Sequence, residues 1–201
     1  MSAQIVRVTV QSCLLAATSN ILAQFITAYR SGSSFQIDWT TVLQFILFAA
    51  LNGPPNYLWQ QFLESTFPGF TLAPSSNGID AASHPSATDP TLEKPAQPLV
   101  EPRRNLANVA AKFLCDQTVG AALNTLAFSL AMAGFRGASP SQALQMARQD
   151  FWPLVRAGWK LWPAVSLVNF TLLTSVEART LLGSLAGMAW TVYLSLVASG
   201  R

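Results

Sequence analysis

The stretch from residue 151 to residue 195 is the feature that most constrains what this chain can fold into. It holds four of the six tryptophans and two prolines, and the pair Glu177 and Arg179 separates two apolar runs. Long apolar runs need an apolar environment, and tryptophan is enriched where lipid meets water. A water-soluble core has little reason to gather residues in this way. The stretch therefore predicts a membrane protein with aromatic edges.

The composition of the whole chain agrees with this prediction. Hydrophobic residues make up 51% of the 201 residues and charged residues only 10%, against roughly 25% charged in soluble domains. A membrane-crossing helix needs about 20 apolar residues, so the length suits four or five crossings. We predict an all-α fold, a polytopic transmembrane helical bundle of four or five spans, formed by residues 1–201 as a single integral membrane domain.

The charges and cysteines exclude several other classes of protein. The net charge is only +3, and the basic residues are scattered without a Lys/Arg run, so no nucleic-acid partner is expected. Cys13 and Cys115 lie far apart, without the spacing of metal ligands or of a disulfide framework. We expect two inert thiols inside the membrane domain.

Residues 5–29 form the first apolar segment that is long enough to span a membrane. Ser12, Ala16, Asn20 and Gln24 recur within it every four residues. This spacing places them on one stripe of a helix, and the large apolar side chains lie elsewhere on the helix surface. We expect the stripe to face other helices.

Residues 39–63 form the second apolar segment, which Gly53-Pro54-Pro55 interrupts. Proline removes backbone donors, so the helix must end at Asn52 or be kinked at this helix break. Because the apolar pattern continues beyond the prolines, we favour a kinked span with Trp59 near a membrane interface.

Residues 71–104 differ in kind from the rest of the chain. Six of the twelve prolines fall here, among Ser, Thr, Ala and Asp. Such a segment cannot bury enough apolar surface to fold, so we predict a disordered Pro/Ser-rich linker between the second and third spans. The only histidine, His84, lies inside it. Because the chain also lacks a nucleophile motif, a phosphate loop and paired carboxylates, we expect no enzyme, no cofactor and no metal site.

Residues 105–135 resume the helical pattern with a second stripe. Small and polar side chains recur there every three or four residues: Lys112, Asp116, Gly120, Asn124, Ala127 and Ala131. A carboxylate within a span is costly, usually faces the bundle interior or water, and is a functional-site hypothesis by default. The alternative is that Asp116 forms an ion pair with Lys112 or with a basic residue of another helix. Lys112 could instead extend to the headgroups.

Ser139-Pro140 predicts the start of another helix. Ser139 is placed to cap it, Pro140 suits the first helical position, and Gln142 completes a capping box. From there to residue 151, polar and apolar side chains occupy opposite faces. We therefore predict an amphipathic helix that lies on the membrane surface.

The tryptophans that follow indicate a membrane interface. Trp152, Trp159 and Trp162 fall on one side if the helix continues, which is more typical of an interfacial belt than of a ligand cage. Residues 161–176 are then predicted to enter the membrane, and residues 181–198 to form another apolar helix that gives a fifth span if it crosses. The predicted interfacial aromatic side chains are Trp59, Trp152, Trp159, Trp162 and Trp190.

A series of motifs carries a resemblance to a known family. In chain order the motifs are Asn52-Gly-Pro-Pro-Asn-Tyr-Leu-Trp59, Lys112-Phe-Leu-Cys-Asp-Gln117, Trp159-Lys-Leu-Trp-Pro163, Asn169-Phe170, Arg179 and Trp190-Thr-Val-Tyr-Leu-Ser195. They resemble the Mpv-type family of small integral membrane proteins of peroxisomes and mitochondria, typified by the twenty-two-kilodalton peroxisomal membrane protein. The resemblance covers nearly the whole chain except the linker. It implies a four-span helical bundle and a channel with weak selectivity for small solutes.

These observations lead to two functional hypotheses. The first is a passive channel for small solutes in an organellar membrane, the mitochondrial inner membrane or, as the alternative, the peroxisomal membrane. Its partners would be the lipid bilayer, small solutes and further copies of the chain in a homo-oligomer. The second is a non-conducting structural or assembly protein of the same membrane. The polar residues expected to line the path or to hold the helices together are Asn20, Gln24, Lys112, Asp116, Gln117, Asn124 and Arg179. Because an unpaired charge in a membrane is costly, we expect Arg179 to pair with Asp116.

Overall fold

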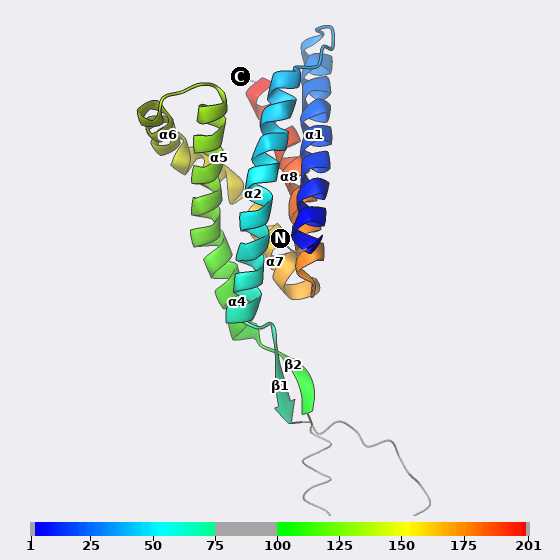
Figure 1. Cartoon of the computed structure of the whole chain (residues 1–201). Coiled ribbons are helices and arrows are strands. Elements are labelled where there is room, and N and C mark those ends of the chain that lie inside the picture. Colours follow the sequence, from blue (N-terminus) through cyan, green and yellow to red (C-terminus); the bar gives the residue numbers. More distant parts are fainter. Residues whose placement is uncertain (1–2, 75–99, 200–201) are drawn as a thin grey trace, which may run out of the picture.

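Helices dominate the fold (Figure 1). The computed structural model describes residues 3–74 and 100–199. The helices are α1 (Ala3–Ser31), α2 (Trp39–Thr66), α4 (Leu106–Cys115), α5 (Ala121–Phe135), α6 (Pro140–Gly158), α7 (Trp162–Leu172) and α8 (Val176–Ser199). A π-helical turn, η1 (Asp116–Gly120), joins α4 to α5 as one helical segment. The predicted all-α fold is thereby confirmed, with one two-stranded ladder added to it.

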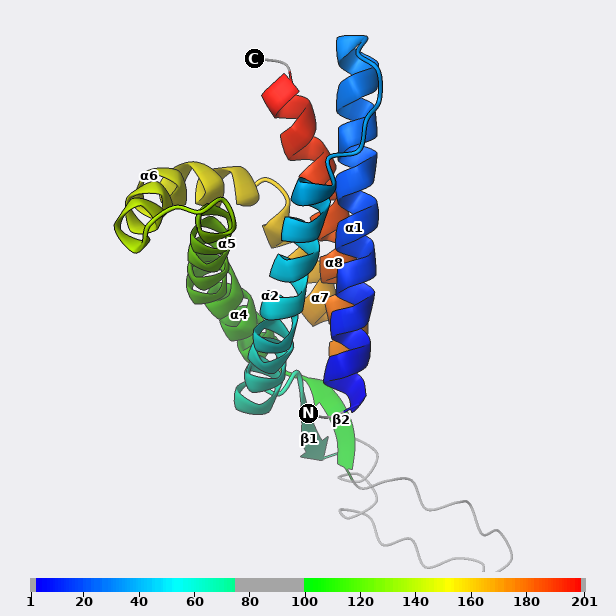
Figure 2. The same cartoon turned by 45° about the horizontal axis from the view of Figure 1, so that its top comes forward.

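The long helices form an elongated bundle. α1 packs along both α2 and α8, and the segment from α4 to α5 packs against α2 and carries α6. α6 lies crosswise to the long helices, and α7 lies beside the lower part of α8 (Figures 1 and 2). In Figure 2 the N and C marks stand near opposite ends of the bundle.

The bundle exposes many large apolar side chains and buries several polar and charged ones among its apolar core residues. Leu14, Leu51 and Leu123 are each more than half exposed, whereas Lys112 and Arg179 are buried. Two helical segments, Ala3–Ser31 and Leu106–Phe135, are long and apolar enough to cross a membrane, and only 17% of each apolar window is buried inside the chain. Their exposed apolar surface is what lipid, and not water, would cover.

α2 continues through its prolines. Pro54 and Pro55 lie inside the helix, so the alternative that it ends at Asn52 is wrong. Gly53, just before them, faces α1: a Cβ there would lie 3.2 Å from the Thr9 hydroxyl oxygen. The missing side chain thus lets the two helices approach closely where the prolines have removed backbone donors.

Asp38 caps the start of α2. Its carboxylate accepts hydrogen bonds from the backbone N–H of Thr40 (3.0 Å) and of Thr41 (3.2 Å) and from the Thr41 hydroxyl (2.5 Å). These bonds, the Thr41 hydroxyl first, lower the pKa of Asp38 because they favour its charged form. The cap therefore contributes stability above the unfolded-state pKa, about 3.9, and loses it as the pH falls through the lower folded-state pKa.

Acid should remove the stabilising effect of the Asp38 cap. In detergent, wild type should melt at a higher temperature than Asp38→Asn at neutral pH, since the neutral amide makes weaker bonds. The difference between the two melting temperatures should shrink below about pH 4. A difference that is constant from pH 7 to pH 3 would contradict this account of the cap.

A short antiparallel ladder joins the two sides of the predicted linker. β1 (Phe70–Pro74) pairs with β2 (Val100–Arg104) in a register that matches Phe70 with Arg104 and Pro74 with Val100. The sequence analysis did not anticipate these strands, so its prediction of a disordered linker is wrong for residues 71–74 and 100–104. Residues 75–99, with His84, lie outside the described residues, so disorder of the linker stays a prediction.

The capping box at the start of α6 is confirmed. The Gln142 backbone N–H donates to the Ser139 hydroxyl (3.4 Å), and the Ser139 backbone N–H donates to the Gln142 side chain (2.9 Å). α6 nevertheless ends at Gly158, so Trp162 belongs to α7 and not to one continuous helix with Trp152. Gly158 permits this turn, because a Cβ there would lie 3.1 Å from the Trp162 ring.

The last two predicted segments have different bounds in the structure. α7 has 11 residues and ends at Leu172, whereas the prediction ran from 161 to 176. At 1.5 Å per residue α7 is about 16 Å long, roughly half of a 30 Å hydrocarbon core. α8 begins at Val176, so Glu177 and Arg179 lie in its first turn and do not separate two helices.

Candidate functional site

A line of polar side chains runs along the contact between α2 and the segment 106–135, and we call it the polar seam. Its members are Asn52, Trp59, Gln60 and Glu64 of α2, together with Lys112, Asp116, Gly120 and Asn124. Four residues of the predicted stripe, Lys112, Asp116, Gly120 and Asn124, thus contact α2, whereas Ala127 of the same stripe is exposed.

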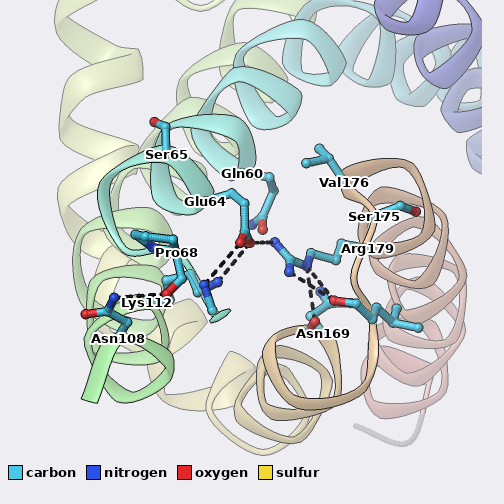
Figure 3. Close-up of polar contacts among 12 residues, drawn as sticks. Gln60, Glu64, Ser65, Pro68, Asn108, Lys112, Asn169, Ser175, Val176 and Arg179 are labelled. Atoms are coloured by element: carbon cyan, nitrogen blue, oxygen red, sulfur yellow. Dashed lines mark hydrogen bonds and ion pairs between the residues drawn. The ribbon is translucent and has the colours of Figure 1, made fainter. Parts of the chain in front are cut away.

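An ionic junction closes one end of the seam. Glu64 accepts a hydrogen bond from the Lys112 ammonium (2.8 Å) and another from the Arg179 guanidinium, so one carboxylate ties α2, α4 and α8 together (Figure 3). The Lys112 and Arg179 side chains are 0% and 3% exposed, and Glu64 is 32% exposed. Lys112 therefore does not extend to the surface. Both cations also lie 5.5 Å from the Phe170 ring centroid.

Backbone carbonyls of α7 hold the Arg179 side chain in place. Its Nε donates to the carbonyl oxygens of Asn169 (3.2 Å) and Leu173 (3.0 Å), and its Nη2 donates to that of Leu173 (2.9 Å). These carbonyls end α7 and have no partner within the helix, so the guanidinium satisfies them. The junction thereby fixes the turn between α7 and α8.

Asp116 occupies the middle of the seam and bonds only to neutral donors. Its carboxylate accepts from the Trp59 indole N–H (3.3 Å) and from the side-chain amides of Gln60 (3.2 Å) and Gln117 (3.2 Å). The expected pairing of Arg179 with Asp116 is wrong, because Arg179 pairs with Glu64. The α7–α8 turn carries Arg179 to the end of α2, one helical turn beyond Asp116.

The third contact of the seam joins two amides. The Asn52 side chain donates to the Asn124 side-chain oxygen at 2.8 Å. Asn52 directly precedes Gly53-Pro54-Pro55, so this bond connects the proline-bearing part of α2 to α5.

The π-helical turn keeps the seam straight. Lys112, Asp116, Gly120 and Asn124 are four residues apart, a spacing that in a regular α-helix drifts about 40° at each step. η1, Asp116–Gly120, has more residues per turn than an α-helix, so the drift between residues four apart is smaller there. As a result all four residues meet α2. Such turns are frequently found at functional sites.

Gly120 leaves room for the Trp59 indole. A Cβ at Gly120 would lie 2.9 Å from the indole nitrogen, 3.3 Å from Cε2 and 3.4 Å from an Asp116 carboxylate oxygen. A side chain there would therefore push the indole off the carboxylate.

Gly120→Ala should consequently destabilise the protein by about 1–3 kcal/mol through overpacking and change the emission of Trp59. Thermal melting and tryptophan fluorescence in detergent measure both effects. The matched control is Gly134→Ala on α5, where nothing lies within 4 Å of the new Cβ. Equal effects of the two substitutions would contradict the packing described for Gly120.

Asn20 and Gln24 lie apart from the polar seam. The Gln24 amide donates to the Asn20 side chain (2.7 Å) and to the Asp38 carbonyl (3.1 Å), and it accepts from the Asp38 N–H (2.7 Å). The two residues thus fasten α1 to the start of α2. The structure does not bring the two predicted stripes into one site.

The predicted interfacial tryptophans have different surroundings. Trp152 and Trp159 are about half exposed, and the Trp159 indole donates to the Gln117 carbonyl at 3.4 Å. Trp190 stacks on Tyr193 at 5.5 Å, and Trp59 is part of the seam. Their location at a membrane interface stays a prediction.

The sequence analysis missed Glu64 and Gln60. Glu64 follows the predicted second span by one residue, and Gln60 lies one helical turn before it. A signal was present, because Lys112 and Arg179 lie in apolar segments and each needs a counter-charge. Residues 39–63 carry no charged side chain, and Glu64 is the carboxylate that directly follows them.

Large apolar side chains on the outer surface and the buried charges of Lys112 and Arg179 between helices are typical of a helical membrane protein. Residues 133–195 match the Mpv17 / PMP22 family. The chain is 25% identical to PXMP2/4 family protein 3 of Dictyostelium discoideum over 166 residues, which are 83% of this chain and 71% of that relative. No solved structure matches the chain.

Other relatives match a shorter part. The chain is 33% identical to Protein SYM1 of Eremothecium gossypii over 47% of its length and 51% of the relative's. It is 34% identical to the Mpv17-like protein of Bos taurus over 46% of each. These matches span about half of those relatives. Together they confirm the predicted resemblance to the Mpv17 / PMP22 family, and they support an organellar membrane protein.

Proposed function

We propose that the protein is a passive channel with weak selectivity for small solutes, without enzymatic activity or a cofactor. The observation that carries the proposal is Asp116, a carboxylate about one third of the way along a helical segment that is long and apolar enough to cross a membrane. It is only partly buried and no cation pairs with it among the described residues. A membrane protein tolerates such a group chiefly where it meets water or a pathway.

The proposed topology follows from helix length. α1, α2, the segment 106–135 and α8 have 29, 28, 30 and 24 residues, and each exceeds the roughly 20 needed to cross. We propose that these four cross the membrane, that α6 lies along one interface, and that α7 returns the chain toward the side where α8 begins, so that α1 begins and α8 ends on opposite sides. We place the protein in the mitochondrial inner membrane, with the peroxisomal membrane as the alternative.

Planar bilayers test the channel. The purified protein should conduct ions. Under a salt gradient, the reversal potential of Asp116→Asn should shift toward the value of an anion-selective channel, because a fixed negative charge is lost. Asp150→Asn, which removes an exposed carboxylate on α6, is the matched control and should leave the reversal potential unchanged. A lack of conductance in every lipid composition would refute the proposal.

The second candidate is a non-conducting structural protein, and the pairing of its polar residues favours it. Gln24 bonds Asn20, Asn52 bonds Asn124, and Glu64 joins two cations, so each contact could serve helix packing alone. In that case Asp116→Asn would lower the melting temperature in detergent without changing solute flux into liposomes. A channel predicts a change in flux selectivity at constant oligomeric state.

A further inference from the structure

Within residues 3–74 and 100–199, four buried side-chain oxygens have no hydrogen-bond partner. They belong to Gln60, Gln117, Ser166 and Asn169, and all four residues are at least nine-tenths buried. Gln60 lies on α2 and Gln117 in the π-helical turn, whereas Ser166 and Asn169 lie on α7, which packs against α4 and η1. Nearly all buried polar atoms in proteins are satisfied. Unpaired oxygens in such number call for a ligand that the chain does not supply.

Two of these oxygens lie beside Asp116. Gln60 and Gln117 each turn the amide nitrogen toward the carboxylate, because only the nitrogen can donate. In an amide the oxygen lies about 2.3 Å from the nitrogen. Each unpaired Gln oxygen therefore lies within about 5.5 Å of an Asp116 oxygen, given the 3.2 Å bonds.

The charges of the seam are segregated. Lys112 and Arg179 both direct their nitrogens to Glu64, which leaves one excess positive charge there. Asp116 lies one helical turn from Lys112, carries a negative charge, and receives only neutral N–H donors. The part of the chain that the structure describes thus holds a carboxylate with no direct counter-ion next to unpaired acceptor oxygens.

We propose that Asp116, with the side-chain oxygens of Gln60 and Gln117, binds one monovalent alkali cation. Oxygen ligands suit hard cations such as Na⁺ and K⁺. A single carboxylate favours a monovalent ion, since the sites of Ca²⁺ and Mg²⁺ usually rely on further carboxylates or phosphates. The inference does not depend on conduction, because the ion binds whether or not the chain forms a channel.

Ion binding to the purified, full-length protein in detergent is the test. Radioactive Rb⁺, a stand-in for K⁺, and radioactive Na⁺ are titrated in choline chloride at constant ionic strength. One ion of at least one species should bind per chain, in a saturable way. The same ion should raise the melting temperature by about 2–6 °C relative to choline, since a ligand of the folded state stabilises it. Absence of saturable binding of both ions to the wild type overturns the proposal without any variant.

Two substitutions locate the ion. Asp116→Asn removes the charge, and Gln117→Met removes an amide oxygen at similar volume. Binding should fall at least tenfold in either variant that folds and persist in Asp150→Asn, the control on α6. Undiminished binding in Asp116→Asn or Gln117→Met would refute the site. If the stabilisation follows pH and is equal in K⁺, Na⁺ and choline, the ligand is a proton and the proposal is wrong.

Discussion

Replacing Glu64 by glutamine is expected to lower the free energy of unfolding by about 3–5 kcal/mol, because it leaves two buried cations without their common counter-charge. Lys112 and Arg179 are 0% and 3% exposed and have no other carboxylate partner in the described residues. For a chain of this length the melting temperature should fall by about 6–20 °C. Thermal unfolding in detergent, followed by circular dichroism at several heating rates, measures the loss.

Two further variants make this result specific. Glu177→Gln removes a carboxylate from the first turn of α8 that forms no described ion pair, and it should melt close to wild type. Adding Lys112→Met to Glu64→Gln should recover part of the loss, since one of the two unpaired cations is gone. A loss below about 1 kcal/mol, typical of exposed pairs, would show that the junction is not buried in the sense described here.

Leu63→Ala should cost about 2–5 kcal/mol through the cavity it leaves. Leu63 is fully buried and packs with Val109 and Phe170 beneath the ionic junction. Because Phe170 also contacts both cations of the junction, the cavity should loosen them as well. The melting temperature in detergent gives the size of the loss.

Leu58→Ala supplies the comparison for Leu63. It removes the same atoms from the same helix, but Leu58 is 51% exposed and lies on the outer surface of α2. Its effect should be less than half that of Leu63→Ala. Similar losses at the two positions would contradict the assignment of Leu63 to the core.

Patterns within one segment predicted much of the fold. Apolar periodicity placed the long helices, the Ser139 capping box placed the start of α6, and the four-residue spacing from Lys112 to Asn124 identified the face that meets α2. Each of these depends on neighbours in sequence, so local chemistry was sufficient.

Partners between segments were out of reach of the sequence. Arg179 had two candidate carboxylates, Asp116 and Glu64, and the choice depends on where α7 ends and α8 begins. The break between α6 and α7 had local signals in Gly158 and Pro163, but helix periodicity outweighed them. The π-helical turn has no comparable signal, since its residues also suit an α-helix.

Because β1 pairs with β2, the packing of α2 against α4 does not depend on the length of the chain between the two strands. Pro74 and Val100 are paired, so the chain departs and returns at neighbouring points. Two bonds near the bundle, from the Asn105 N–H to Gly69 and from the Asn108 side chain to Pro68, each 2.9 Å, set how α4 starts relative to the end of α2. Loop-closure entropy grows only slowly with length. The length and the sequence of residues 75–99 can therefore change in evolution while the contacts between α2 and α4 keep their register.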